Sequence, residues 1–223
     1  RDADIIIGLY QKYDIHYFKI DGISLPSKQA ELNLVKFFDK VYAETDSAVV
    51  FNLDATAGSR AGYHYINPFY GNIFLENRYT DWKNYYPYWT LRNLWMLSKY
   101  TPAEGFQMEF LNKWRNGDKY PGYIPFAPQK LPFDYSFAIT MMSQPLAWFE
   151  GSSLPEEGYK IAPLIKAYNE IQYDIHSGYI FPIGEEPSGR SWTGFQSIES
   201  DNEGFILVFR ELNETNSKRI KTW

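Results

Sequence analysis

Two charged residues on one short β-prone run are the first in the chain that could do chemistry. In residues 17–24 (YFKIDGIS), Lys19 and Asp21 stand two positions apart and a glycine follows at once. Because side chains alternate along a strand, residues two apart lie on the same side, so Lys19 and Asp21 are expected to point into one space. A charged pair on a short buried strand is costly unless it is used. The carboxyl ends of parallel strands hold the reacting groups of α/β enzymes, so the run predicts an active-site carboxylate.

Other polar residues follow the ends of later β-prone runs. The run 48–52 (AVVFN) ends at Asn52 and Asp54, and a glycine-punctuated loop with Arg60 comes next. The run 72–76 (NIFLE) opens into residues 77–82 (NRYTDW), and a further run, 146–150 (LAWFE), has an acidic end. These ends supply further candidate site residues, namely Arg78, Asp81, Trp82, Trp148 and Glu150.

Helical patterns alternate with these strands in the first part of the chain. Apolar spacing predicts helices over residues 3–12 and 28–44, the latter burying Leu32, Val35, Phe38, Val41 and Tyr42. Strands are expected at 17–22, 48–52 and 72–76. Each unit thus consists of an apolar strand with a polar carboxyl end, followed by a helix. This alternation is typical of a parallel sheet or a (β/α) barrel.

The same alternation of strands and helices continues to Gly178, and a different sequence pattern follows it. We expect a helix at 89–100, a strand at 106–111, a Gly- and Pro-rich loop at 117–132, and a helix at 134–143 capped by Asp134. A strand at 146–150 and a helix from Pro155 to about His176 follow. Residues 179–223 are short β-prone runs between turns, which indicates part of a β-sandwich.

Five candidate strands are too few for a whole barrel of eight β/α units, which needs roughly 200 residues or more. The predicted fold is therefore α/β, the C-terminal half of a (β/α)8 TIM-type barrel followed by the start of an antiparallel β-sandwich domain. The predicted domains are a partial catalytic barrel at 1–178 and a partial β-domain at 179–223. Such a half barrel exposes sheet edges and apolar surface, which would favour a homo-oligomer.

Composition excludes several classes of partner. The net charge of -5 offers no basic face for a nucleic acid, and no apolar run is long enough to span a membrane. Zero cysteines exclude thiolate metal sites and a cysteine nucleophile, and the histidines His16, His64 and His176 lack ligand spacing, so no metal or cofactor is expected. The acidic start RDAD does not read as a secretory leader. The compartment stays open between a periplasmic, a secreted and another soluble location. Aromatic residues make up 19% of the chain, as is common around sugar sites.

The motifs resemble those of a known family. The runs FKIDG and NIFLENRYTDW, with LRNLW, PLAWFE and the closing SWTGFQSI and GFILVFRE, are similar to the retaining α-galactosidases and α-N-acetylgalactosaminidases, the melibiase-type glycoside hydrolases of families 27 and 36. The resemblance implies that Asp21 is the nucleophile, that Lys19 holds sugar hydroxyls, and that Asp81 is the acid/base beside Arg78. At the expected fifth-strand end the chain has FNLDATAGSR, where relatives carry a cysteine or tryptophan, so the sugar preference does not carry over.

Physical reasoning supports the same two carboxylates. The ammonium of Lys19 favours the ionised form of Asp21, and the rings near Asp81, among them Tyr79, Tyr85 and Tyr86, would desolvate that carboxyl and keep it protonated. Retaining enzymes hold two such groups about 5 to 5.5 Å apart. Glu76 and Asp54 are alternatives to Asp81 as the acid.

Each candidate also has a structural interpretation. A strand-end Lys-x-Asp without context is more often an ion pair, and a strand-end tryptophan such as Trp148 is at least as often part of the core. Asn52, Asp54 and Arg60 could bind sugar hydroxyls or hold turns together. The alternative to an active glycosidase is a catalytically silent carbohydrate-binding or structural fragment of such an enzyme.

Overall fold

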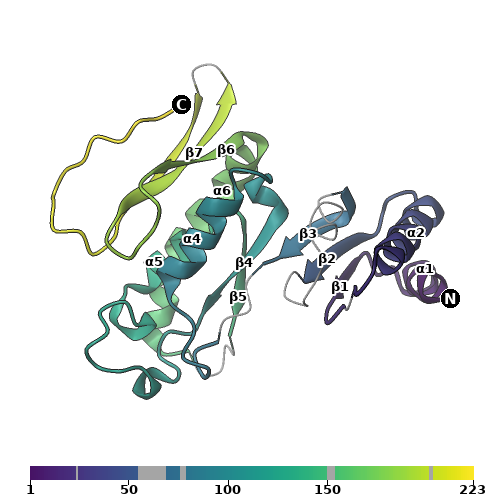
Figure 1. The fold of residues 1–223 in the computed structure, drawn as a ribbon, viewed down its shortest axis with the longest axis horizontal. Coiled ribbons are helices and arrows are strands. Elements are labelled where there is room, and N and C mark those ends of the chain that lie inside the picture. Colours follow the sequence, from purple (N-terminus) through teal and green to yellow (C-terminus); the bar gives the residue numbers. More distant parts are fainter. Residues whose placement is uncertain (24, 55–68, 76–78, 150–153, 201–202) are drawn as a thin grey trace. The chain divides into compact units, whose positions relative to one another are not determined.

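The computed structural model describes residues 1–23, 25–54, 69–75, 79–149, 154–200 and 203–223. The chain forms two compact units, Arg1–Glu76 and Asn77–Trp223, which we describe in turn (Figure 1). The predicted division into domains at 1–178 and 179–223 stays a prediction. None of the described helices combines the length and the apolar character needed to cross a membrane.

The first unit is an α/β layer with three parallel strands. Its elements are α1 (Asp2–Tyr13), β1 (Tyr17–Ile20), α2 (Lys28–Thr45), β2 (Val50–Asp54) and β3 (Gly71–Phe74). Strand β2 lies between β1 and β3 and pairs parallel with both, with Lys19 opposite Asn52 and Asn52 opposite Asn72. The predicted order of helices and strands is confirmed, although β2 extends two residues beyond the predicted end.

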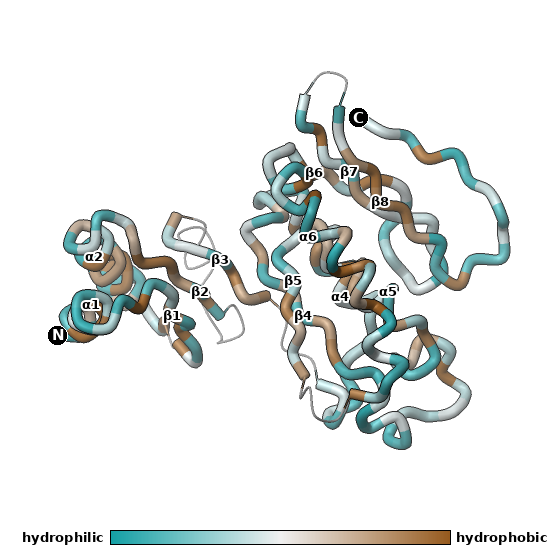
Figure 2. Tube along the Cα trace, turned by 180° about the vertical axis from the view of Figure 1, so that it is seen from behind, coloured by the Kyte–Doolittle hydropathy of each residue, from teal (hydrophilic) through white to brown (hydrophobic). Residues whose placement is uncertain are grey.

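The core of this unit lies between α2 and the sheet. Phe38, Val41, Phe51 and Leu53 have no exposed surface, and the Phe38 ring lies 4.9 Å from that of Phe51. Figure 2 shows that β2 begins hydrophobic and turns hydrophilic at its carboxyl end. The expectation that Leu32 is buried is wrong, since its side chain is 45% exposed.

Strand β1 is less buried than expected. Tyr17 is 48% exposed, and Phe18 and Ile20 are half-buried. The reason is topological, because among the described strands of this unit β1 pairs with β2 alone and so forms an edge. The charged pair near its end therefore lies at the rim of the sheet.

The described residues of the second unit begin with two more parallel strands and the helices around them. Its elements are α4 (Pro87–Leu97), β4 (Phe106–Leu111), α5 (Phe133–Ala138), β5 (Gln144–Trp148) and α6 (Ala162–Ser177). Strands β4 and β5 pair in parallel with Leu111 opposite Trp148, so both strands end at one edge. In the part of this unit that the structure describes, 3-10 turns join these elements at Ala103–Gly105, Gly117–Lys119, Pro128–Lys130 and Glu156–Ile161.

Helix α5 is shorter than the predicted helix at 134–143. The chain leaves the helix after Ala138, where Thr140 donates through its hydroxyl to the Phe137 carbonyl and Ser143 donates to the Thr140 carbonyl. Such side-chain bonds compete with helical ones and favour turns. The predicted Asp134 cap is also wrong, because Pro132 is the N-cap residue and Asp134 lies inside the first turn.

A three-stranded antiparallel sheet follows α6, as the short β-prone runs of residues 179–223 predicted. Strands β6 (Tyr179–Gly184), β7 (Trp192–Ser200) and β8 (Glu203–Arg210) lie in that order, beside α6 (Figure 1). Ser197 on β7 donates to the Ile175 carbonyl of α6 at 2.6 Å, which ties the sheet to the helix.

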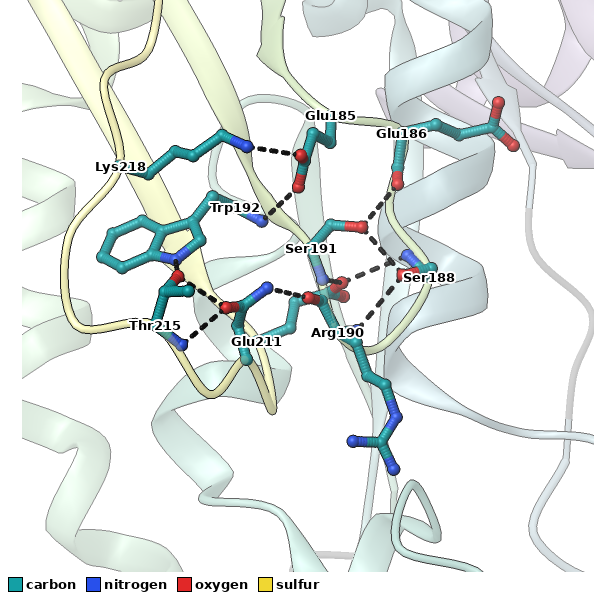
Figure 3. Close-up of polar contacts among 10 residues, drawn as sticks. Glu185, Glu186, Ser188, Arg190, Ser191, Trp192, Glu211, Thr215 and Lys218 are labelled. Carbon is teal, nitrogen blue, oxygen red and sulfur yellow. Dashed lines mark hydrogen bonds and ion pairs between the residues drawn. The ribbon is translucent and has the colours of Figure 1, made fainter.

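A buried carboxylate fastens the loop between β6 and β7. Glu211, 8% exposed, accepts hydrogen bonds from the backbone N–H groups of Ser188 at 3.1 Å and Ser191 at 2.9 Å, and from the Tyr135 hydroxyl at 3.1 Å. Figure 3 shows the surrounding polar contacts, which include the ion pair of Lys218 with Glu185. This polar network joins α5, the β6–β7 loop and the end of β8.

Candidate active site

Four polar side chains gather at the carboxyl ends of β1 and β2. Lys19 and Asp21 form an ion pair, with Nζ 3.4 Å from Oδ2, as the spacing predicted. Asn52 and Asp54 alternate on β2 in the same way, and they are only 1% and 2% exposed. The Lys19 ammonium also lies 4.3 Å from the centre of the Phe74 ring on β3, a cation–π contact that helps to hold it in place.

The surroundings of Asp21 favour its ionised form. Its pKa lies below the usual value, first because of a hydrogen bond with Asp54, then because of the charge and hydrogen bond of Lys19 and the backbone N–H of Gly22, while partial burial opposes the shift. Gly22 adopts a left-handed φ of 63°, which a glycine accepts at no steric cost. This conformation directs the Gly22 N–H toward the Asp21 carboxylate. The hydrogen bond favours the ionised form of Asp21, which is the form that a nucleophile needs.

The second unit holds a cavity at the carboxyl ends of β4 and β5. Its volume is about 490 Å³, within the range of ligand sites. Asp81 and Trp148 both line it, so these two predicted residues are brought together. Asn112, Arg115 and Asn116 line it as well. Trp148 is 39% exposed, which fits a pocket wall better than a core position.

The segment that carries Asp81 is held by hydrogen bonds from its neighbours. Asn116 donates to the Thr80 hydroxyl at 3.0 Å, and the Tyr79 N–H donates to the Asn84 side chain at 2.8 Å. Lys119 donates to the Asp81 carbonyl at 3.5 Å. These contacts fix the backbone on both sides of Asp81.

The expected aromatic enclosure of Asp81 is wrong in this structure. Asp81 is an exposed residue, Tyr85 is fully buried, and Trp82 is 65% exposed with its ring 4.6 Å from that of Tyr79. The aromatic residues nearby in sequence thus leave the Asp81 side chain exposed.

The polar residues that line the cavity directly after β4 were missed from the sequence, namely Asn112, Arg115 and Asn116. They follow β4 directly, in the position where the other strands place their polar residues. The polar run NKWRN carries the signal, but the Gly- and Pro-rich stretch that follows it makes the whole segment resemble a loop. Asn112 is buried and accepts the Trp114 N–H at 3.1 Å, so the loop begins with a tight polar turn.

Four of the candidates lie outside the described residues: Arg60, Glu76, Arg78 and Glu150. Among the residues that are described, no group of three or more His, Cys, Asp or Glu side chains could hold a metal ion.

Solved structures reveal what the chain is similar to, although no family model and no curated protein sequence matches it. The GH36 α-galactosidase AgaA from Geobacillus stearothermophilus matches with a TM-score of 0.68 and 14% identity, over 97% of this chain and 30% of that protein. A variant of AgaA solved in complex with raffinose gives the same values. The galactosidase domain of the α-galactosidase–sucrose kinase AgaSK matches with a TM-score of 0.58 and 13% identity, over 90% of this chain and 29% of that one.

These matches concern the fold, since the identities are low. The chain spans about 30% of the length of AgaA and of AgaSK. It therefore has the fold of one portion of the GH36 α-galactosidases, a partial (β/α) barrel followed by a small antiparallel sheet.

Proposed function

We propose that the full-length protein containing these residues is a retaining glycoside hydrolase that cleaves terminal α-galactoside-type linkages. Asp21 is the nucleophile and Asp81 is the acid/base. The observation that carries the proposal is the Lys19–Asp21 ion pair at the carboxyl end of β1, in a chain whose fold matches GH36 α-galactosidases over 97% of its length. The cavity beside Asp81 supports the second role.

In the first step, the Asp21 carboxylate attacks the anomeric carbon and a glycosyl ester bond forms. The bond from that carbon to the leaving oxygen breaks, and the proton of Asp81 passes to this oxygen. Ionisation of Asp21 is a requirement of this step, and the hydrogen bond with Asp54 and the charge of Lys19 favour it.

In the second step, water attacks the same carbon from the side of the departed group. Asp81 takes a proton from the water, the ester bond breaks, and Asp21 returns as a carboxylate. The other candidates are assigned to the binding of sugar hydroxyls and rings: Lys19, Asn52, Asp54, Arg60, Arg78, Trp82, Trp148 and Glu150.

A second candidate function applies to these 223 residues alone. The described residues supply five parallel strands, whereas a barrel has eight. We expect the isolated chain to show little or no turnover and to behave as a carbohydrate-binding or structural fragment.

Hydrolysis of an aryl α-galactoside by the full-length protein tests the proposal. Asp21→Asn should abolish turnover, whereas Asp2→Asn, an exposed aspartate on α1, should not change it. Unchanged activity in Asp21→Asn would exclude Asp21 as the nucleophile. NMR of the first product should show the α-anomer of the free sugar, because two displacements retain the configuration.

The role of Asp81 is tested by the leaving group. Asp81→Asn should slow cleavage of an alkyl galactoside far more than that of a dinitrophenyl galactoside, because a good leaving group does not need a proton. The matched control is Asp118→Asn, another exposed aspartate of the same unit. Equal losses for both substrates would assign the acid to another residue, with Glu76 and Asp54 as the next candidates.

A further inference from the structure

Asp81 lies in a tight turn that runs from Thr80 to Lys83. The Lys83 N–H donates to the Thr80 carbonyl at 3.2 Å, and this hydrogen bond closes the turn. Thr80 is 7% exposed, whereas Asp81 is an exposed residue, and both line the cavity at the carboxyl ends of β4 and β5. The place of the Asp81 side chain therefore depends on what holds Thr80 at the buried end of the turn.

The group that holds Thr80 comes from the segment after β4. Asn116, 36 positions further along the chain, donates through its side-chain amide to the Thr80 hydroxyl at 3.0 Å. From the same segment, Lys119 donates to the Asp81 carbonyl at 3.5 Å. Two neighbouring residues of the Asp81 turn are thus bonded to residues 116–120, which we call the 116–120 turn.

The 116–120 turn is itself well anchored. Tyr120 is 4% exposed, and its hydroxyl donates to the Tyr85 carbonyl at 3.0 Å. Gln129 donates through its side chain to the Gly117 carbonyl at 3.1 Å. Because both ends of the 116–120 turn are bonded to other segments, it can serve as a support for the Asp81 turn.

Asn116 meets two requirements at this position. Its backbone is left-handed, with a φ of 59° and a ψ of 22°, a conformation that asparagine tolerates better than most residues. Although Asn116 begins the 3-10 turn Gly117–Lys119, its side chain makes no capping hydrogen bond there and is bonded to Thr80 instead. One residue thus combines an uncommon backbone conformation with a donor that reaches the neighbouring segment.

We propose that Asn116 is a positioning residue, which fixes the Asp81 carboxyl in the cavity by holding the Thr80 hydroxyl. This role rests on the proposed function, because it concerns the acid/base residue of that reaction. Asp81 has to meet the leaving oxygen in the first step and the water in the second. A displacement of about 1 Å can slow such a step by about a hundredfold, so a hydrogen bond one residue away affects the rate.

Amide hydrogen exchange in the 223-residue chain tests the support without any turnover. Asn116→Gly accepts the left-handed backbone and removes the donor, and Thr80→Val removes the acceptor and keeps a similar shape. In both variants the N–H groups of Tyr79 and Lys83 should exchange about tenfold faster or more, since the turn opens more readily. The Trp89 N–H, which is bonded in the next turn, should not change. Unchanged exchange of Tyr79 and Lys83 in both variants would overturn the proposal.

The dependence on the leaving group tests the catalytic consequence in the full-length protein. Both variants should slow cleavage of an alkyl galactoside by about ten- to a hundredfold and that of a dinitrophenyl galactoside much less, because only the poor leaving group needs a proton. A purely structural defect would lower both rates alike. Thr80→Ser, which keeps the hydroxyl, should restore the wild-type ratio of the two rates, and the double variant of Asn116→Gly with Thr80→Val should be no slower than either single variant.

The positioning role and the proposed function fail in different ways. If Asp81→Asn spares the dinitrophenyl galactoside while Asn116→Gly and Thr80→Val keep the wild-type ratio of rates, the proposed function stands and the positioning role is refuted. If Asp81→Asn slows both substrates equally, Asp81 is not the acid, and the role of Asn116 in the reaction is refuted with it.

Discussion

The Glu211 carboxylate offers a quantitative test of how the second unit is held together. Replacing it by alanine leaves the N–H groups of Ser188 and Ser191 and the Tyr135 hydroxyl without their acceptor. A buried donor without a partner costs about 1–3 kcal/mol. Ser191 is buried and Tyr135 is partly buried, whereas Ser188 is exposed, so its N–H can bond to water instead. The pKa of Glu211 is raised by burial, which shows that its charge itself opposes folding. The expected loss therefore lies toward the low end of the sum for the two less accessible donors, at about 2–3 kcal/mol.

The isosteric change separates charge from hydrogen bonding. In Glu211→Gln one oxygen can still accept from the two backbone N–H groups, so the loss should be about 1 kcal/mol. The matched control is Glu199→Ala, an exposed glutamate on β7, which should change stability by less than about 0.5 kcal/mol.

Urea unfolding followed by tryptophan fluorescence measures these differences, and amide hydrogen exchange locates them. Ser188 and Ser191 should lose most of their protection in Glu211→Ala. A loss below about 1 kcal/mol, or unchanged protection of these two amides, would refute the assignment of Glu211 as the acceptor that fastens the loop.

Two further predictions concern the two cores. Phe38→Ala should destabilise the first unit by about 3–5 kcal/mol, because the buried Phe38 ring stacks on Tyr70 at 4.7 Å. The control Leu32→Ala, at an exposed position of the same helix, should cost less than about 1 kcal/mol. Urea unfolding midpoints measure both changes, and equal shifts would contradict the assignment of Phe38 to the core. His176 has a pKa lowered chiefly by burial, so the folded state binds its proton less readily than the unfolded state. The free energy of unfolding should therefore fall as the pH drops below about 6.5. In His176→Gln, unfolding curves measured between pH 7 and 5 should show a weaker dependence of this free energy on pH. The same dependence in both proteins would contradict the role of His176.

Much of the fold could be predicted because the periodic elements are distinct. The strand at 106–111 has the predicted bounds, and each end of α1 and α2 lies within one residue of its predicted position. Strand β2 ends two residues after its predicted end, because a polar residue in the sequence does not mark the end of the core here. Asn52 and Asp54 are polar and yet almost fully buried, so the strand continues through them.

The candidate site was only partly predictable. The Lys19–Asp21 contact followed from strand alternation, which is a local rule. The cavity at Asp81 depends on contacts between distant segments, such as the 3.0 Å hydrogen bond from Asn116 to Thr80, and no local pattern predicts these. Asp81 is exposed and Tyr85 is fully buried, a difference that nearness in sequence does not determine.

The most direct test of the central claim is to trap the glycosyl ester on its residue. The full-length protein is treated with a 2-deoxy-2,2-difluoro α-galactoside that carries a good leaving group, digested, and sequenced by mass spectrometry. The account predicts one labelled peptide, from the YFKIDGIS segment, with the sugar on Asp21 and no label in Asp21→Asn. Label on any other carboxylate, with Asp21 unmodified, would contradict it.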